Sequence, residues 1–113
     1  MNMEIRLAKE ITPPGPGQIR AFFVSAGNPV LSAPDGRELE DALEQLELMV
    51  SIDLYVNETN CHADYVLPAT TMYERADFPL PFQALQPTQL RQATEAVVAP
   101  AGEAREEWDV VEE

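Results

Sequence analysis

Two apolar runs decide the fold. The first reads Phe22-Phe23-Val24-Ser25-Ala26-Gly27-Asn28-Pro29, and after one helix-length segment comes Leu48-Met49-Val50-Ser51-Ile52-Asp53. Each is compact and almost uncharged, which is typical of a strand buried on both faces of a parallel sheet. The first strand is expected over Ile19–Ser25, and Gly27 permits a tight turn after it. Two strands joined by a helix form a right-handed crossover and pair in parallel, so we expect Asn28 and Asp53 at carboxyl ends of neighbouring strands.

The segment between the runs predicts an acidic amphipathic helix. Asp35 stands at the N-cap position and Glu38 follows three residues later, as in a capping box. One face of this helix is apolar and is formed by Leu39, Ala42, Leu43 and Leu46.

The flanking segments carry weaker signals. Residues 1–11 predict a short helix that Pro13-Pro14-Gly15-Pro16-Gly17 stops, so we interpret residues 1–18 as a leader or linker and 19–113 as a single domain. Tyr65–Leu67 predicts a third short strand that Pro68 ends. Further predictions are an extended segment over Phe78–Gln92 with Pro79 and Pro81, an edge strand over Thr94–Val98, and a terminal helix over Glu103–Val111 with Trp108 and Val111 packed inward.

Composition restricts the class of protein. The chain has 113 residues and a formal charge of -13. That length suits one small domain with a core. The negative charge disfavours binding to nucleic-acid phosphates and anionic lipid surfaces, and we exclude both as partners.

Charge and cysteine usage give further expectations. Two acidic stretches, 35–58 and 100–113, are interpreted as a solvated helix face and a solvated tail. Cys61 is the single cysteine, so an intrachain disulfide is excluded, and a cytoplasmic location is expected. No apolar run in the sequence reaches the roughly 20 residues that a membrane helix needs.

Polar residues gather at the predicted strand ends, where open parallel sheets bind ligands. They are Asn28, Ser51, Asp53, Thr70 and Arg75. A carboxylate such as Asp53 can accept two hydrogen bonds from the N1–H and amino group of guanine. Asn28 could reach ribose or phosphate oxygens, and Arg75 could pair with a phosphate.

Each of these residues also has a structural interpretation. Asn28 could be only a cap or turn former, and Arg75 could form a surface pair with Glu74. His62 beside Cys61 suggests a metal site, but no second pair stands at ligand spacing. Glu58 and Asp64 are expected to serve the ends of a short helix. The sequence offers no nucleophile and base pair, so we assign no catalytic residue and no metal ligand.

Several motifs together resemble a known family. They are the run from Phe22 to Pro29, Ser51-Ile52-Asp53, Glu58-Thr59, Ala63-Asp64-Tyr65-Val66-Leu67-Pro68-Ala69 and Tyr73-Glu74-Arg75. In this order and spacing they resemble the third domain of molybdopterin oxidoreductases, a family that includes formate dehydrogenases, nitrate reductases and dimethyl sulfoxide reductase.

The resemblance implies a three-layer, Rossmann-like α/β domain with a short, mostly parallel sheet flanked by helices. Such a domain holds part of a molybdopterin guanine dinucleotide on molybdenum or tungsten. Carried over by position, Asn28 would lie near ribose or pyrophosphate, while Ser51, Ile52 and Asp53 would contact the guanosine end. Arg75 would be a basic contact and Thr59 a weaker candidate.

Two features of the family pattern are missing from this sequence. Neither a cysteine motif for a 4Fe-4S cluster nor a residue that ligates the metal is recognisable. The resemblance therefore implies a fragment of a larger oxidoreductase that is not active alone and retains no cofactor alone. Its partners would be the rest of the enzyme chain and an electron-transfer subunit, and the 4Fe-4S cluster would lie in the N-terminal part of that enzyme.

Two other classes remain as alternatives. In a receiver-like regulatory module Asp53 would be a phosphoacceptor, but such a module needs neighbouring acids at the end of the first strand and a later lysine. Here the first strand ends in Ser25-Ala26-Gly27, and Lys9 is the only lysine. A free-standing interaction module would dock a partner through the acidic helix or Trp108.

Overall fold

The computed structural model describes residues 3–78, 85, 87–88 and 92–112. The chain folds as two compact units, Met1–Leu67 and Pro68–Glu113, and each is described by itself. The elements of the first unit are α1 (Met3–Ile11), β1 (Ala21–Ser25), α2 (Pro29–Ser32), α3 (Gly36–Leu43), β2 (Leu48–Asp53), the 3₁₀ helix η1 (Asn60–His62) and β3 (Tyr65–Pro68).

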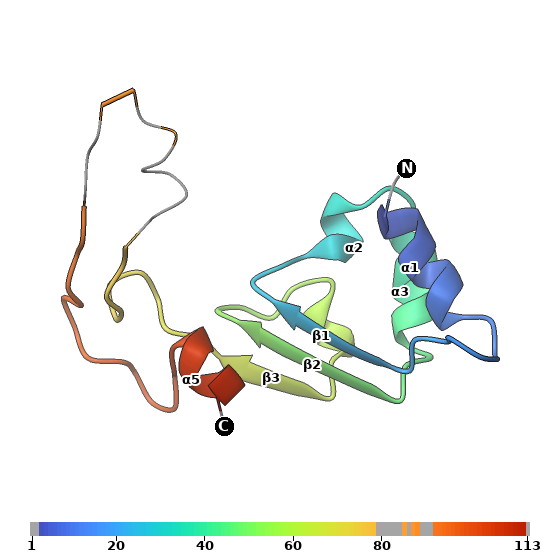
Figure 1. Ribbon diagram of the computed structural model, residues 1–113. Helices are drawn as coiled ribbons and strands as arrows, with labels where there is room; N and C mark the ends of the chain where they lie inside the picture. The colour runs from blue at the N-terminus through green and yellow to red at the C-terminus, as the bar shows by residue number, and fades with distance from the viewer. Residues whose placement is uncertain (1–2, 79–84, 86, 89–91, 113) are drawn as a thin grey trace. The chain divides into compact units, whose positions relative to one another are not determined.

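A three-stranded sheet in the order β1-β2-β3 forms the centre of the first unit, and its strands run in the same direction (Figure 1). β1 and β2 pair in parallel, with Phe22 opposite Met49 and Val24 opposite Ser51. The predicted strand, helix, strand order is confirmed, as is β3. The expected fold class, an α/β domain with a short parallel sheet flanked by helices, is also confirmed.

Helices α1 and α3 pack against each other and cover one face of the sheet (Figure 1). The buried core consists of Ala8, Ile11, Val24, Leu39, Ala42, Leu43 and Met49. In α3, Ala42 and Leu43 follow Leu39 by three and four positions, as the helical period requires. Paired strand residues point to the same face, so Phe22 and Met49 face the helices. Phe23, on the opposite face, is 52% exposed.

Helix α1 belongs to this core, although the sequence suggested only a leader. Ala8 and Ile11 are 3% and 0% exposed. The proline-rich segment that follows is held in place, because the side-chain amide of Gln18 donates to the Ile11 carbonyl at 2.8 Å. The domain boundary at residue 18 stays a prediction.

The start of α3 differs from the predicted capping box. Asp35 has the left-handed φ of 60° and its side chain makes no capping hydrogen bond, so the capping-box prediction was wrong. The helix begins at Gly36, whose Cα faces the backbone of Val30 so closely that a Cβ would overlap the Val30 carbonyl. Close packing of α2 against α3, not a side-chain cap, therefore sets this helix start.

The second unit has little regular structure in its described residues. Ala69 and Arg105 form a parallel bridge, and Asp77 and Thr94 an antiparallel one. The strand predicted over Thr94–Val98 is wrong beyond this single bridge. The terminal helix α5 is shorter than predicted and spans Glu107–Glu112.

Two further predictions concern this unit. Trp108 and Val111 are 76% and 70% exposed, so their predicted packing was wrong. The extended segment predicted over Phe78–Gln92 lies largely outside the described residues, including Pro79 and Pro81. In the described part of the chain, no helix has the length and apolar character needed to cross a bilayer.

Replacing Gly36 with alanine should destabilise the first unit. Alanine normally favours a helix over glycine, but here its Cβ would overlap the Val30 carbonyl. We expect the free energy of unfolding to fall by about 1–3 kcal/mol in urea denaturation. Gly27→Ala is the matched control, because the nearest atom to its new Cβ lies 3.4 Å away. Equal stabilities of the two variants would contradict this account.

Candidate functional site

The two strand ends lie side by side, as the sequence predicted. Asn28 follows β1 and stands at the N-cap of α2, while Asp53 is the last residue of β2. The ladder continues past the end of β1, where the Ala26 N–H donates to the Ile52 carbonyl at 2.9 Å. Both candidate residues therefore belong to one edge of the sheet.

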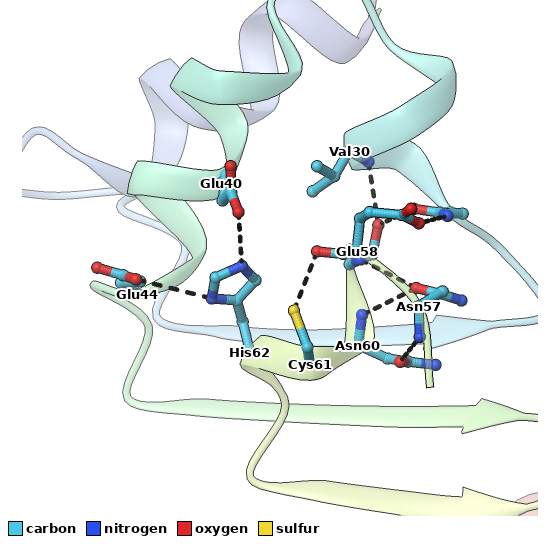
Figure 2. A network of polar contacts seen from close by, with 10 residues as sticks. Val30, Glu40, Glu44, Asn57, Glu58, Asn60, Cys61 and His62 are labelled. Carbon is cyan, nitrogen blue, oxygen red and sulfur yellow. Dashed lines mark hydrogen bonds and ion pairs between the residues drawn. The ribbon is translucent and has the colours of Figure 1, made fainter. Parts of the chain in front are cut away.

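Asn28 is held by the loop that follows β2, and its side chain makes no cap bond to α2. Its Nδ2 donates to the Glu58 carboxylate at 2.6 Å, and its Oδ1 accepts from the Thr59 hydroxyl at 2.7 Å. The same Thr59 oxygen accepts the Val30 N–H at 3.0 Å. Figure 2 labels Val30 and Glu58, two of the residues that this network joins. Thr59 is fully buried, so the hydroxyl ties the end of β1 to the loop after β2.

Asn57 organises the beginning of η1 (Figure 2). Its Oδ1 accepts the N–H groups of Thr59 at 2.9 Å and Asn60 at 3.0 Å. Asn60 reciprocates, because its Oδ1 accepts the Asn57 N–H at 2.6 Å and its Nδ2 donates to the Tyr55 carbonyl. These two amides fix the loop between β2 and η1.

Asp53 is anchored on one side by the same loop. Its Oδ1 accepts the Leu54 N–H at 2.7 Å, and its Oδ2 accepts the Asn57 Nδ2 at 3.0 Å. These two hydrogen bonds provide a local structural reason for Asp53 that was not apparent from the residues around it in the chain. Because a carboxylate has about four acceptor positions, this partly exposed group retains acceptor capacity on both oxygens.

Ser51 and Ile52 lie beneath the surface of the strand end. Both side chains are 0% exposed. The Ser51 Oγ has no hydrogen-bond partner within the described structure. Any contact of these two residues with a ligand would fall to their main chain, and their site roles stay predictions.

Glu58 and Asp64 do not serve helix ends in the expected way. Glu58 holds Asn28, and that hydrogen bond, with one from its own backbone N–H, holds the pKa of the Glu58 carboxyl below its ordinary value. Asp64 pairs with the start of β2, because its Oδ2 accepts the Met49 N–H at 2.7 Å. Both carboxylates therefore connect separate elements of the first unit.

His62 faces helix α3 and not the strand ends (Figure 2). Its Nε2 lies 3.5 Å from a Glu40 oxygen and its Nδ1 3.8 Å from a Glu44 oxygen, with the side chain 14% exposed. The Cys61 thiol points to the Glu58 carbonyl at 3.3 Å. The described residues contain no cluster of three such side chains suited to a metal ion.

The remaining candidates, Thr70 and Arg75, belong to the second unit. Thr70 is 3% exposed and donates its N–H to the Arg105 carbonyl. The sequence left open a surface pair between Glu74 and Arg75, and the structure gives Glu74 contacts with Thr71 and Ala101. Its carboxylate accepts the N–H and hydroxyl of Thr71 and the Ala101 N–H, which lower its pKa. Arg75 lines a hollow together with Ala76, Asp77, Phe78, Glu106, Glu107 and Trp108.

Sequence reasoning missed Asn57 and Asn60 as site residues. Nothing in their spacing distinguishes them from ordinary turn formers. The only available signal was the presence of two asparagines shortly after Asp53, where a short helix was predicted. Their roles become visible only through the partners that the fold brings to them.

The chain belongs to the molybdopterin oxidoreductase family, whose profile matches residues 1–113. The family implies a molybdopterin cofactor with molybdenum or tungsten. The resemblance inferred from the strand-end motifs is thus confirmed at the level of the family.

Particular relatives support the same membership. The chain is 38% identical over 99 residues to the thiosulfate reductase molybdopterin-containing subunit PhsA of Salmonella typhimurium, covering 87% of this chain and 13% of that protein. It is 32% identical over 95 residues to the assimilatory nitrate reductase catalytic subunit of Bacillus subtilis, covering 84% and 13%. Among solved structures, acetylene hydratase from Pelobacter acetylenicus matches with a TM-score of 0.80 and 27% identity, over 98% of this chain and 15% of that chain. The chain thus spans about an eighth of the length of these relatives.

Thr59→Val tests what the Thr59 hydroxyl contributes to stability, because valine keeps the shape of the side chain. Valine removes the bond to Asn28 and leaves the Val30 N–H without its partner. We expect a loss of about 1–3 kcal/mol in the free energy of unfolding. Thr59→Ser keeps the hydroxyl and should cost about 1 kcal/mol or less, for one buried methyl group. A loss in Thr59→Val no larger than that in Thr59→Ser would contradict the role of the hydroxyl.

The Glu58 carboxylate should make stability depend on acidity. Its pKa in the folded state is below the ordinary 4.5, so its contribution is present above that pH and is lost as the pH falls through the lower folded value. Urea unfolding of the wild type and Glu58→Gln should therefore differ near neutral pH and converge in acid. A difference that stays constant across this window would contradict the assignment.

Proposed function

We propose that this chain holds the guanosine end of a molybdopterin guanine dinucleotide within a larger molybdopterin-dependent oxidoreductase. The observation that carries the proposal is the continuous network from Asp53 through Asn57 and Thr59 to Asn28. It fixes two ligand-type side chains at the carboxyl ends of neighbouring parallel strands, where open sheets bind nucleotides.

The donor and acceptor set suits the guanosine end. Asp53 retains one outward acceptor position on each oxygen, which matches the two adjacent donors of guanine. Adenine offers one donor beside an acceptor, so the same carboxylate would bind it less well. Asn28 and backbone groups after β1 are polar contacts for ribose or pyrophosphate. Thr59, Ser51 and Ile52 support the site from beneath, since all three are buried.

The bound group supplies the redox chemistry at molybdenum or tungsten. The described residues supply position only, and we propose that catalysis requires the rest of the enzyme. We further propose that this chain corresponds to the third domain of the family and works in the cytoplasm. Its partners would be the remaining enzyme chain, which would carry a 4Fe-4S cluster, and an electron-transfer subunit. Arg75 is proposed as a basic contact to the same cofactor.

The relatives support this class of reaction in general terms. A thiosulfate reductase subunit and a nitrate reductase catalytic subunit both match over more than four-fifths of this chain. Shared sequence over the same stretch in enzymes with different named substrates fits a cofactor-holding part better than a substrate-selecting one. We therefore place substrate selection elsewhere in the enzyme.

Asp53→Ala in the complete enzyme should reduce the retained cofactor. Removal of the carboxylate leaves the guanine donors without acceptors, so we expect pterin and metal content to fall several-fold in the purified variant. Asp41→Ala, an exposed acid on α3, is the matched control and should keep full content. Circular dichroism of the 113-residue chain should show both variants folded. Unchanged pterin and metal content in Asp53→Ala would overturn the assignment.

A further inference from the structure

The side chain of Asn57 has a single orientation that its neighbours dictate. Its Oδ1 lies 2.9 Å and 3.0 Å from two backbone N–H groups, those of Thr59 and Asn60. A flipped amide would turn its own N–H groups toward these donors. The Nδ2 group must therefore face Asp53, which it meets at 3.0 Å.

Asn57 and the adjacent Leu54 N–H together set the plane of the Asp53 carboxylate. One donor meets each oxygen. Each oxygen therefore keeps one acceptor position that these two hydrogen bonds leave unused. An asparagine at position 57 thus makes a freely rotating carboxylate into a fixed two-acceptor group.

We propose that Asn57 is a positioning residue that gives this site its preference for guanine over adenine. The inference rests on the proposed function and adds to it, because it assigns base selectivity to a residue that need not touch the ligand. Asp53 is the contact, and Asn57 fixes the direction in which that contact points.

The same residue also connects the base end of the site to Asn28. Asn57 accepts the Thr59 N–H, and Thr59 donates its hydroxyl to Asn28. A change at Asn57 that preserves its Oδ1 should leave the bonds through Thr59 to Asn28 intact. A single isosteric substitution can therefore remove the bond to Asp53 without removing the bonds toward Asn28.

Asn57→Asp makes that separation. The variant keeps an oxygen for the Thr59 and Asn60 N–H groups but replaces the donor to Asp53 with an acceptor. At neutral pH the two carboxylates repel each other, and Asp53 turns away. In acid the pair shares one proton, which restores a donor at the position that the Asn57 amide occupied.

The test measures affinities for GMP and AMP by NMR titration of the 113-residue chain at about pH 7.5 and about pH 5, two values that bracket the expected protonation. The wild type should prefer GMP at both. Asn57→Asp should lose about tenfold or more of that preference at the higher pH, the scale of one bidentate base contact, and regain it at the lower. Because each ratio compares two nucleotides with the same phosphate, titration of the phosphate cancels.

Cys61→Asp is the control for added charge. Cys61 is exposed and lies on η1, directly after the loop that contains Asn57, and its thiol points to the Glu58 carbonyl. The control should keep the GMP preference at both pH values. A second readout needs no ligand, since the side-chain ¹³C signal of the new aspartate should report the shared proton at the lower pH.

The outcomes separate the two proposals. A guanine preference in the wild type that Asn57→Asp retains at neutral pH would overturn the role of Asn57 and leave the proposed function standing. Loss at both pH values, or an equal loss in Cys61→Asp, would also overturn it, because a general structural or charge effect would then suffice. Absence of any GMP preference in the wild type would overturn the proposed function, and the selectivity role with it.

Discussion

The hydrogen bond from the buried Thr59 hydroxyl to Asn28 is the interaction on which the site depends. It crosses from the loop after β2 to the residue after β1, and the same oxygen accepts the Val30 N–H of α2. A parallel sheet brings two strand ends together, but it leaves the side chains that follow them free to rotate. Thr59 removes that freedom, and Asn57 extends the constraint to Asp53.

The sheet and helix α3 could be predicted because their buried residues follow spacings in the sequence that are typical of a strand and of a helix. Val24 and Met49 lie in apolar runs, and Leu39 and Leu43 recur at the helical period, so each residue's environment follows from its neighbours in sequence. The predicted capping box of α3 was wrong because the start of this helix depends on a contact with α2. The capping-box pattern at Asp35 describes local hydrogen bonding, whereas contact between Gly36 and the Val30 backbone is tertiary.

The positions of the candidate residues could be predicted, but their hydrogen-bond partners could not. Asn28 and Asp53 were singled out because open parallel sheets bind ligands at strand ends, and the structure places both residues there. Their partners were not, since the Asn28–Thr59 and Asn28–Glu58 bonds join residues about thirty positions apart in the chain. In the second unit the apolar spacing of Trp108 and Val111 suggested a packed helix face, yet both are largely exposed. Periodicity indicates which residues share a face and gives no information on what covers that face.

We propose that a guanosine group binds at the joined strand ends of the first unit. The most direct measurement is a map of backbone amide chemical-shift changes in ¹⁵N-labelled chain titrated with GMP, for which we expect binding in roughly the millimolar range because only part of the site is present. If guanosine binds there, the largest changes fall on residues 26–28 and 53–59. Changes spread evenly over the chain, or confined to the hollow around Arg75 and Trp108, would contradict it.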